Sequence, residues 1–433
     1  MHVLLVQPSV SAEPAYPLAL AGIIPLLEAA GHTVSGIDLC FEEVEAIDTA
    51  VDQREVDWVV ATVLHHNASS VMAWMAPLKG RVQTAVAGAL PTLDPHGALA
   101  LTGADFAIVG PPEEALSALI DSGGRRQIDG VISRHTPDLK PRLPTPFALL
   151  PTPDRRVFPV ERYSHAMRST ANPYTQVVTS RGCRRHCPYC TVPAMRPTGF
   201  DPRTPEDVVA EWTALVRDHG VKSIHVEDDS FLADPDRVRR ICEGIHEAGL
   251  TVSWELVNGI RVDQVNLPLL DTMARAGCNR LVYSFEHLNP NHSPAIGHSH
   301  AEAAAAVSWA RECKMRVGGY FIVGLPGESL ASTIESIHLA LKLRLDDANW
   351  IPFYESPGSG FAGCATSIDA TTIRRSTATR LTKLATLAFF ANPETFGQLW
   401  SEIAATPATL PALAEKALEL LRTGGPVPLR DTP

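Results

Sequence analysis

The chain lacks long apolar runs, basic blocks and a disulfide framework, and each absence narrows its function. Its 433 residues contain no apolar run near the roughly 18–20 that cross a membrane, and its first residues lack the basic segment of a signal peptide. A formal net charge of −11 without a lysine- or arginine-rich block argues against a nucleic-acid surface. The cysteines show no disulfide pattern, which suits a reducing compartment. We therefore expect a cytoplasmic protein that binds neither membrane nor nucleic acid.

Three of the eight cysteines are clustered, and they are the most informative part of the sequence. Cys183, Cys187 and Cys190 follow a C-x3-C-x2-C spacing. Thiolates are the preferred ligands of iron–sulfur clusters and soft metals. Three thiolates on a four-iron cubane leave one iron open, and an open coordination position is typical of a catalytic site. The alternative is zinc with His186 as fourth ligand, although His186 and Cys187 would then have to turn onto one ion from adjacent positions.

Residues 1–133 are predicted to form a doubly wound parallel sheet, because short apolar runs alternate with amphipathic helical segments. The expected strands are residues 2–7, 33–38, 57–64, 84–90, 105–110 and 130–133. The expected helices include residues 18–30, 69–79 and 112–121. Ligands of such sheets bind outside the carboxyl ends of the strands.

A proline-rich segment separates the first α/β region from a second one. Residues 134–173 hold closely spaced prolines and are predicted to be an extended linker over a neighbouring domain. In residues 174–360 strands and helices alternate again, which predicts a partial (β/α)6 barrel. Its expected strands are residues 175–180, 223–227, 251–257, 280–285, 317–323 and 349–354. Residues 361–433 are predicted to be a C-terminal helical region.

The cysteine triplet, with Tyr189 just before its last cysteine, resembles the signature of the radical S-adenosylmethionine (radical SAM) superfamily. The triplet follows the first barrel strand, at the rim where barrel enzymes hold their catalytic residues. The resemblance implies a [4Fe–4S] cluster held by Cys183, Cys187 and Cys190, with SAM bound beside it.

The same resemblance assigns further site residues along the rim. The acidic segment Glu227, Asp228 and Asp229 is implied to hold the amino group of SAM and is our candidate catalytic set. The candidate cofactor-binding residues are Tyr189, Glu255, Asn258, Ser284, Glu286, Val323, Gly324 and Pro326. Each has a plainer explanation, because aspartates also cap helices and Gly-Pro segments also make turns.

The N-terminal sheet resembles the cobalamin-binding domain of one large radical SAM class, but with departures. The Asp-x-His-x-x-Gly motif of base-off cobalamin proteins is absent, and two glycine-rich loops of the class are replaced by residues 87–89 and 110–113. These replacements are bulkier or more rigid. We therefore expect cobalamin to be absent, although His65 and His66 would otherwise be candidates to face a cobalt.

For the reaction, the resemblance implies reductive cleavage of SAM to a 5′-deoxyadenosyl radical that abstracts hydrogen from a polar natural product. The size and domain order resemble the radical SAM diol dehydratase that deoxygenates the aminoglycoside paromamine in apramycin biosynthesis. That reading implies a cationic aminoglycoside substrate, an external electron donor of the flavodoxin or ferredoxin type and a partner NAD(P)H reductase. The alternative enzyme is a cobalamin-dependent C-methyltransferase of secondary metabolism. The non-enzymatic alternative is a cluster- or zinc-bearing interaction protein.

Overall fold

The computed structural model describes residues 1–8, 14–53, 55–136, 138–164, 171–288, 297–362 and 373–392. The chain divides into two compact units, one made mainly of residues 1–164 and the other mainly of residues 165–193 and 197–428. None of the described helices is long and apolar enough to cross a bilayer.

The first unit is a six-stranded sheet with helices on both faces. Its strand order is β2-β1-β3-β4-β5-β6. These strands are β1 (His2–Gln7), β2 (Thr33–Asp38), β3 (Trp58–Thr62), β4 (Gln83–Ala87), β5 (Phe106–Ile108) and β6 (Val131–Ser133). The first five are parallel, as predicted, but β6 runs antiparallel to β5 at the edge of the sheet.

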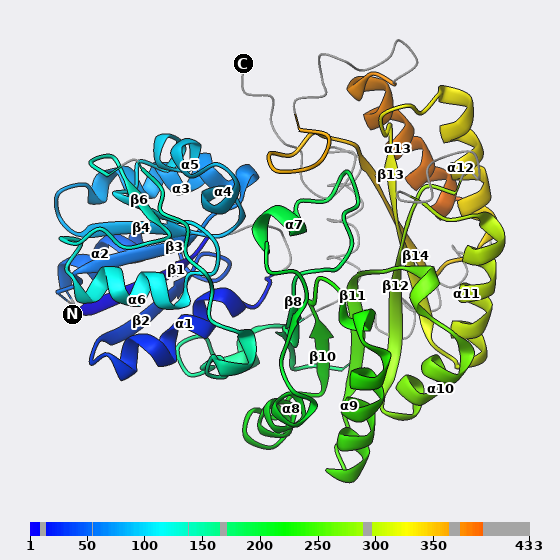
Figure 1. Ribbon diagram of the computed structural model, residues 1–433, viewed down its shortest axis with the longest axis horizontal. Helices are drawn as coiled ribbons and strands as arrows, with labels where there is room; N and C mark the ends of the chain where they lie inside the picture. The colour runs from blue at the N-terminus through cyan, green and yellow to red at the C-terminus, as the bar shows by residue number, and fades with distance from the viewer. Residues whose placement is uncertain are drawn as a thin grey trace. The chain divides into compact units, whose positions relative to one another are not determined.

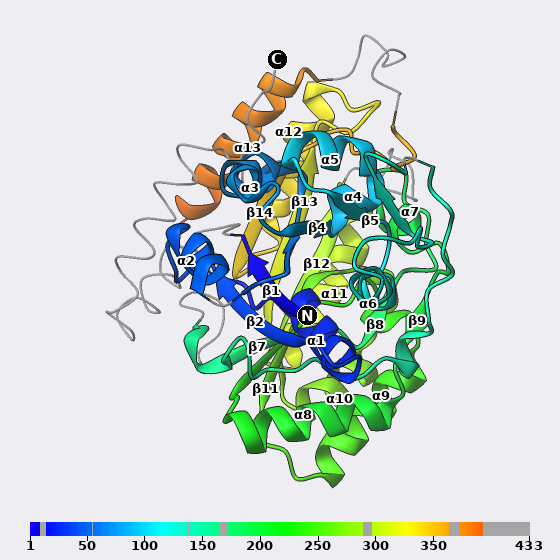
Figure 2. The same ribbon diagram turned by 90° about the vertical axis from the view of Figure 1, so that its left-hand side faces the viewer.

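The helices of the first unit form two layers (Figures 1 and 2). On one face lie α2 (Glu45–Gln53), α3 (Ala68–Met75), α4 (Ala89–Leu93) and α5 (Pro95–Thr102), and on the other α1 (Leu18–Ala29) and α6 (Glu113–Asp121). Every residue of β1 after His2 is buried, because a central parallel strand is covered on both sides.

The proline-rich segment packs against β2 of the first unit. Tyr163 donates a hydrogen bond to the buried carboxylate of Asp38 at 2.7 Å, and Tyr16 donates to the carbonyl of Phe158 at 2.9 Å. A Cβ at Gly36 would lie 2.6 Å from Val157, so glycine lets the segment approach the strand. The segment up to residue 164 is therefore held by specific contacts within this unit.

The second unit is a six-stranded parallel sheet in the order β14-β13-β12-β11-β10-β7. The strands are β7 (Tyr174–Val177), β10 (Ser223–Val226), β11 (Ser253–Ile260), β12 (Cys278–Glu286), β13 (Arg316–Val323) and β14 (Asp347–Pro352). Helices follow the strands and cover the sheet: α8 (Pro205–His219), α9 (Pro235–Glu247), α10 (Leu267–Arg275), α11 (His300–Glu312) and α12 (Leu330–Lys342). The predicted α/β class, a doubly wound sheet followed by a partial barrel, is confirmed.

Local sequence signals explain where these helices begin. Thr204, Asp234 and Asn266 each accept a hydrogen bond from a backbone N–H in the first turn of the helix that follows, and each helix has a proline in that turn. In the C-terminal region the structure describes one further helix, α13 (Arg375–Phe390). Residues 363–372 and 393–433 of the predicted helical region lie outside the described residues.

A small hairpin carries the chain from the first barrel strand into the cysteine loop. It pairs β8 (Ser180–Arg181) with β9 (Asp201–Pro202), so the cysteines lie in the connection between two paired strands. The first predicted barrel strand, 175–180, is therefore two elements, β7 and β8.

Candidate active site

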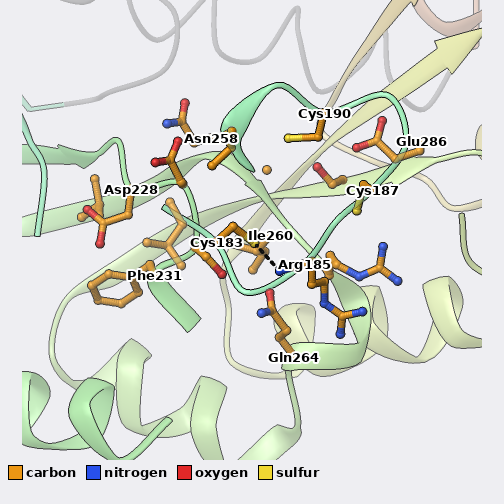
Figure 3. Close-up of a pocket in the computed structure, with 18 of the residues that line it drawn as sticks. Cys183, Arg185, Cys187, Cys190, Asp228, Phe231, Asn258, Ile260, Gln264 and Glu286 are labelled. Atoms are coloured by element: carbon orange, nitrogen blue, oxygen red, sulfur yellow. Dashed lines mark hydrogen bonds between the residues drawn. The ribbon is translucent and has the colours of Figure 1, made fainter. Parts of the chain in front are cut away.

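A pocket of about 320 Å³ opens at the carboxyl ends of the barrel strands. It is lined by the cysteine loop and by the exits of β10, β11 and β12 (Figure 3). Nine of the predicted site residues line it: Cys183, Cys187, Tyr189, Cys190, Asp228, Asp229, Asn258, Ser284 and Glu286. The structure therefore brings together residues that are up to about a hundred positions apart in sequence.

The cysteine loop is shaped by its own backbone. The N–H of Cys190 donates to the carbonyl of Cys187 at 3.0 Å, and the N–H of Arg185 lies 3.4 Å from the Sγ of Cys183. All three thiols are free and half-buried. Burial, with Cys187 and Cys183 nearby, raises the pKa of the Cys190 thiol to about 11.

The donor set fits a cluster better than a single ion. Among the described residues, no three histidine, cysteine, aspartate or glutamate side chains converge on one ion position. A zinc site made by His186 and the three cysteines would require such convergence. A cubane takes each thiolate at a different iron and does not require it.

The acidic segment after β10 is engaged within the protein. The carboxylate of Asp228 is buried and accepts hydrogen bonds from Thr179 and Ser180, and that of Asp229 accepts one from the N–H of Gly182 at 2.7 Å. Burial raises the pKa of Asp228, while these donors oppose the rise. Glu227 does not line the pocket and accepts a bond from the Nε2 of Gln176 at 2.8 Å.

Glu286 is the most unusual side chain of the pocket. It is buried at the end of β12, has a positive φ of 54° and follows an irregularity in the strand pairing. Tyr189 donates a hydrogen bond to its Oε1 at 3.0 Å. Burial raises the pKa of Glu286 to about 7, and hydrogen bonds from Tyr189 and Ser284 limit the rise. The carboxyl group is therefore able to hold a proton near neutral pH.

Two arginines form a cationic end of the pocket to which the sequence analysis assigned no role. Arg185 and Arg261 both line the pocket, beside Gln264. Arg185 pairs with Asp263 at 2.8 Å and Arg261 with the same carboxylate at 3.2 Å, so two positive charges share one negative charge. Their positions in the sequence could have identified them, because Arg185 lies between two of the clustered cysteines and Arg261 directly follows β11.

Asn258 and Gly259 shape the wall between these groups. The Nδ2 of Asn258 donates to the backbone carbonyl of Glu227 at 2.6 Å, which ties the exit of β11 to that of β10. Gly259 has a φ of 81°, and a Cβ there would collide with the Oγ of Ser284. Glycine is therefore required at this position.

Four predicted cofactor-binding residues lie outside the pocket wall. Glu255 was expected near the end of its strand, but β11 continues to Ile260. The prediction that Glu255 lies at the end of its strand is therefore wrong. Its buried carboxylate pairs with Arg280 at 3.2 Å inside the barrel.

Val323 is the last residue of β13, Gly324 and Pro326 belong to the turn that follows, and none of the three lines the pocket. Glu328 closes this turn by accepting the N–H of Gly324 at 2.6 Å, and its buried carboxylate contacts the Nε2 of His287. Gly324 and Pro326 therefore shape a turn in this structure, which is the plainer explanation given for them above.

The sheet of the first unit has one topological switch point. The strand order reverses between β1 and β3, and such switch points are where doubly wound sheets bind their ligands. His65 and His66 follow β3 there and are exposed. The loop is fixed by the buried Asn67, whose Oδ1 accepts the N–H of Leu64 at 2.8 Å.

Two family models match the chain, one in each of its two units. Residues 177–340 match the family model of the Radical SAM superfamily, and residues 9–120 match that of the B12 binding domain. The second match opposes our expectation that cobalamin is absent.

The chain is also similar to individual proteins. It is 24% identical over 333 residues to an uncharacterized methyltransferase of Pyrococcus horikoshii, covering 74% of this chain and 71% of the relative. It is 27% identical over 230 residues to cytidylyl-2-hydroxyethylphosphonate methyltransferase of Streptomyces wedmorensis, covering 48% of this chain and only 41% of that relative. Neither relative is a dehydratase, so the aminoglycoside dehydration expected above has no support here.

A solved structure shares the fold. The radical S-adenosylmethionine methyltransferase TsrM from Kitasatospora setae, with cobalamin and a [4Fe–4S] cluster bound, superposes with a TM-score of 0.68 at 18% identity, covering 83% of this chain and 73% of that one. The chain therefore shares the fold of this protein, with a region similar to the B12 binding domain followed by a region similar to the Radical SAM superfamily.

Proposed function

We propose that the chain is a cobalamin-dependent radical SAM methyltransferase that methylates a carbon atom of a small polar molecule. One observation carries the proposal: a single chain joins a cysteine-lined pocket to a sheet that matches the B12 binding domain. The methyltransferases among its relatives support methyl transfer over dehydration.

The bound groups supply chemistry that side chains lack: the cluster supplies one electron to SAM, and the corrin carries a methyl group. Cys183, Cys187 and Cys190 would hold the cluster, and their thiols must lose protons to do so. Because these protons are released when the metal binds, iron loading should depend on pH. An external one-electron donor of the flavodoxin or ferredoxin type completes the proposal.

The pocket's two charged ends suit the zwitterionic part of SAM. Arg185 and Arg261 would face its carboxylate, because they carry more positive charge than Asp263 neutralises. Asp229 also lines the pocket, and its carboxylate suits an ammonium group. Close pairs of this kind contribute on the order of a few kcal/mol each at an effective dielectric constant near 20.

Anaerobic reconstitution of the full chain with iron, sulfide and hydroxocobalamin tests the proposal. We expect four irons and one corrin per chain, and transfer of label from methyl-labelled SAM to a product. Replacing Cys183, Cys187 or Cys190 with alanine should abolish iron loading, whereas Cys313→Ala, a half-buried cysteine on another element, should not affect it.

Three results would overturn the proposal. Bound zinc without a brown chromophore would support the interaction-protein alternative. A four-iron protein that takes up no corrin would remove the methyl carrier. Loss of water from an aminoglycoside, with no gain of a methyl group, would instead support the dehydratase function.

A further inference from the structure

The segment that enters the cysteine loop is held by buried side chains from neighbouring elements. Asp228, at the exit of β10, accepts hydrogen bonds from the N–H of Thr179 at 2.5 Å, from its Oγ1 at 2.6 Å and from the Oγ of Ser180 at 2.6 Å. Thr179 and Ser180 are fully buried, and Cys183 follows Ser180 by three residues. A carboxylate just after β10 therefore constrains the conformation of the chain before the first cysteine.

A buried arginine on α9 holds the same segment from the other side. Arg237 donates to the carbonyl of Thr179 at 2.7 Å through Nη2 and to the carbonyl of Arg203 at 2.8 Å through Nε. The N–H of Arg203 also donates to the carbonyl of Thr179, at 3.0 Å. The positive charge of Arg237 is attracted to Asp228, so the two buried charges compensate each other.

These bonds leave the Asp228 carboxylate little capacity for a ligand. Only 5% of the residue is exposed, and its oxygens already accept three hydrogen bonds from the protein. The role implied by the family resemblance, holding the amino group of SAM, therefore does not suit Asp228. Its neighbour Asp229 accepts a hydrogen bond from the N–H of Gly182 and lines the pocket, so it is better suited to that role.

We propose that Asp228, together with Arg237, is a positioning residue that holds residues 179–182 in the conformation in which Cys183 can bind the cluster. The inference rests on the proposed function, because it assumes a cluster on the cysteines. A metal ligand is oriented by the groups that hold its backbone and side chain, and loss of such partners commonly costs roughly 10–100-fold in metal affinity.

The test compares Asp228→Asn with wild type, using the full chain reconstituted anaerobically. Asparagine has nearly the same shape but loses the charge and one acceptor oxygen. We expect the variant to fold, to release iron to a chelator roughly 10–100-fold faster than wild type, and to show altered electron paramagnetic resonance and reduction potential of the reduced cluster. Asp236→Asn, on the exposed surface of α9, is the matched control and should behave as wild type.

Thr179→Val provides a second, milder variant that removes only the Oγ1 donor, in case Asp228→Asn does not fold. Wild-type iron release and an unchanged spectrum in a folded variant would overturn the positioning role while leaving the proposed function intact. A wild-type chain that cannot hold four irons would instead overturn the proposed function itself.

Discussion

The phenol of Tyr189 donates a hydrogen bond to Oε1 of Glu286 at 3.0 Å. This bond connects the cysteine loop to the end of β12, across the pocket wall. Both groups are buried enough that burial raises the pKa of each. The contact therefore joins the part of the pocket that would hold the cluster to the part that would hold SAM.

Replacement of Tyr189 separates the contribution of its ring from that of its hydroxyl. Tyr189→Ala removes both and should weaken SAM binding by up to about tenfold, since aromatic contacts contribute roughly 0.5–1.5 kcal/mol. Tyr189→Phe keeps the ring and should weaken binding less. Titration calorimetry with SAM on the reconstituted protein measures both, and equal affinity in all three proteins would exclude a role for this residue.

Glu286 should make stability depend on pH. Its pKa in the folded state, about 7, lies above the ordinary 4.5, so folding favours the protonated carboxyl. That contribution is complete below about pH 4.5 and is lost as the pH rises through 7, a change on the order of 3 kcal/mol.

Glu286→Gln, which imitates the protonated group, isolates this effect. Its advantage in free energy of unfolding over wild type should grow between pH 5.5 and pH 8, as measured by urea denaturation. Parallel pH profiles for the two proteins would contradict the raised pKa.

Much of the fold was predictable from sequence, because strand positions follow apolar runs and helix starts follow caps such as Thr204 and Asp234. The nine pocket residues were predictable because each lies in the last residues of a strand or in the loop after it, at the same rim. The length of each strand was not predictable in the same way. Because β11 continues to Ile260, Glu255 lies well before the strand end and pairs with Arg280, whereas Glu286 is the last residue of β12 and lines the pocket. The antiparallel β6 was missed because direction depends on pairing, not on composition.

The buried charges around Arg280 should be important for stability. Its guanidinium pairs with Glu255 at 3.2 Å and with Asp347 at 2.8 Å, and its side chain is 2% exposed. Arg280→Met should cost about 3–5 kcal/mol, because it leaves Glu255 charged and buried without its partner. Arg275→Met, which breaks an exposed pair with Asp271 on α10, should leave the urea midpoint nearly unchanged. Similar midpoints for the two variants would exclude a structural role for the buried pair.

Gly36 and Gly22 test the packing of the proline-rich segment on the first unit. Gly36→Ala would bring a Cβ within 2.6 Å of Val157 and 2.7 Å of Phe158, and such overpacking typically costs about 1–3 kcal/mol. Gly22→Ala, inside α1, meets no atom within 4 Å and should stabilise the helix by about 0.5–1 kcal/mol. Thermal unfolding of both variants checks the contrast, and an equally stable Gly36→Ala would show that the segment is not held against β2.

The bond from Tyr163 to Asp38 has a practical consequence for engineering. A chimera that exchanges the N-terminal half for that of a relative should be joined after Ser164 and not at residue 134. A junction at the earlier point would separate the buried acid from its phenol and leave β2 without the chain that covers it.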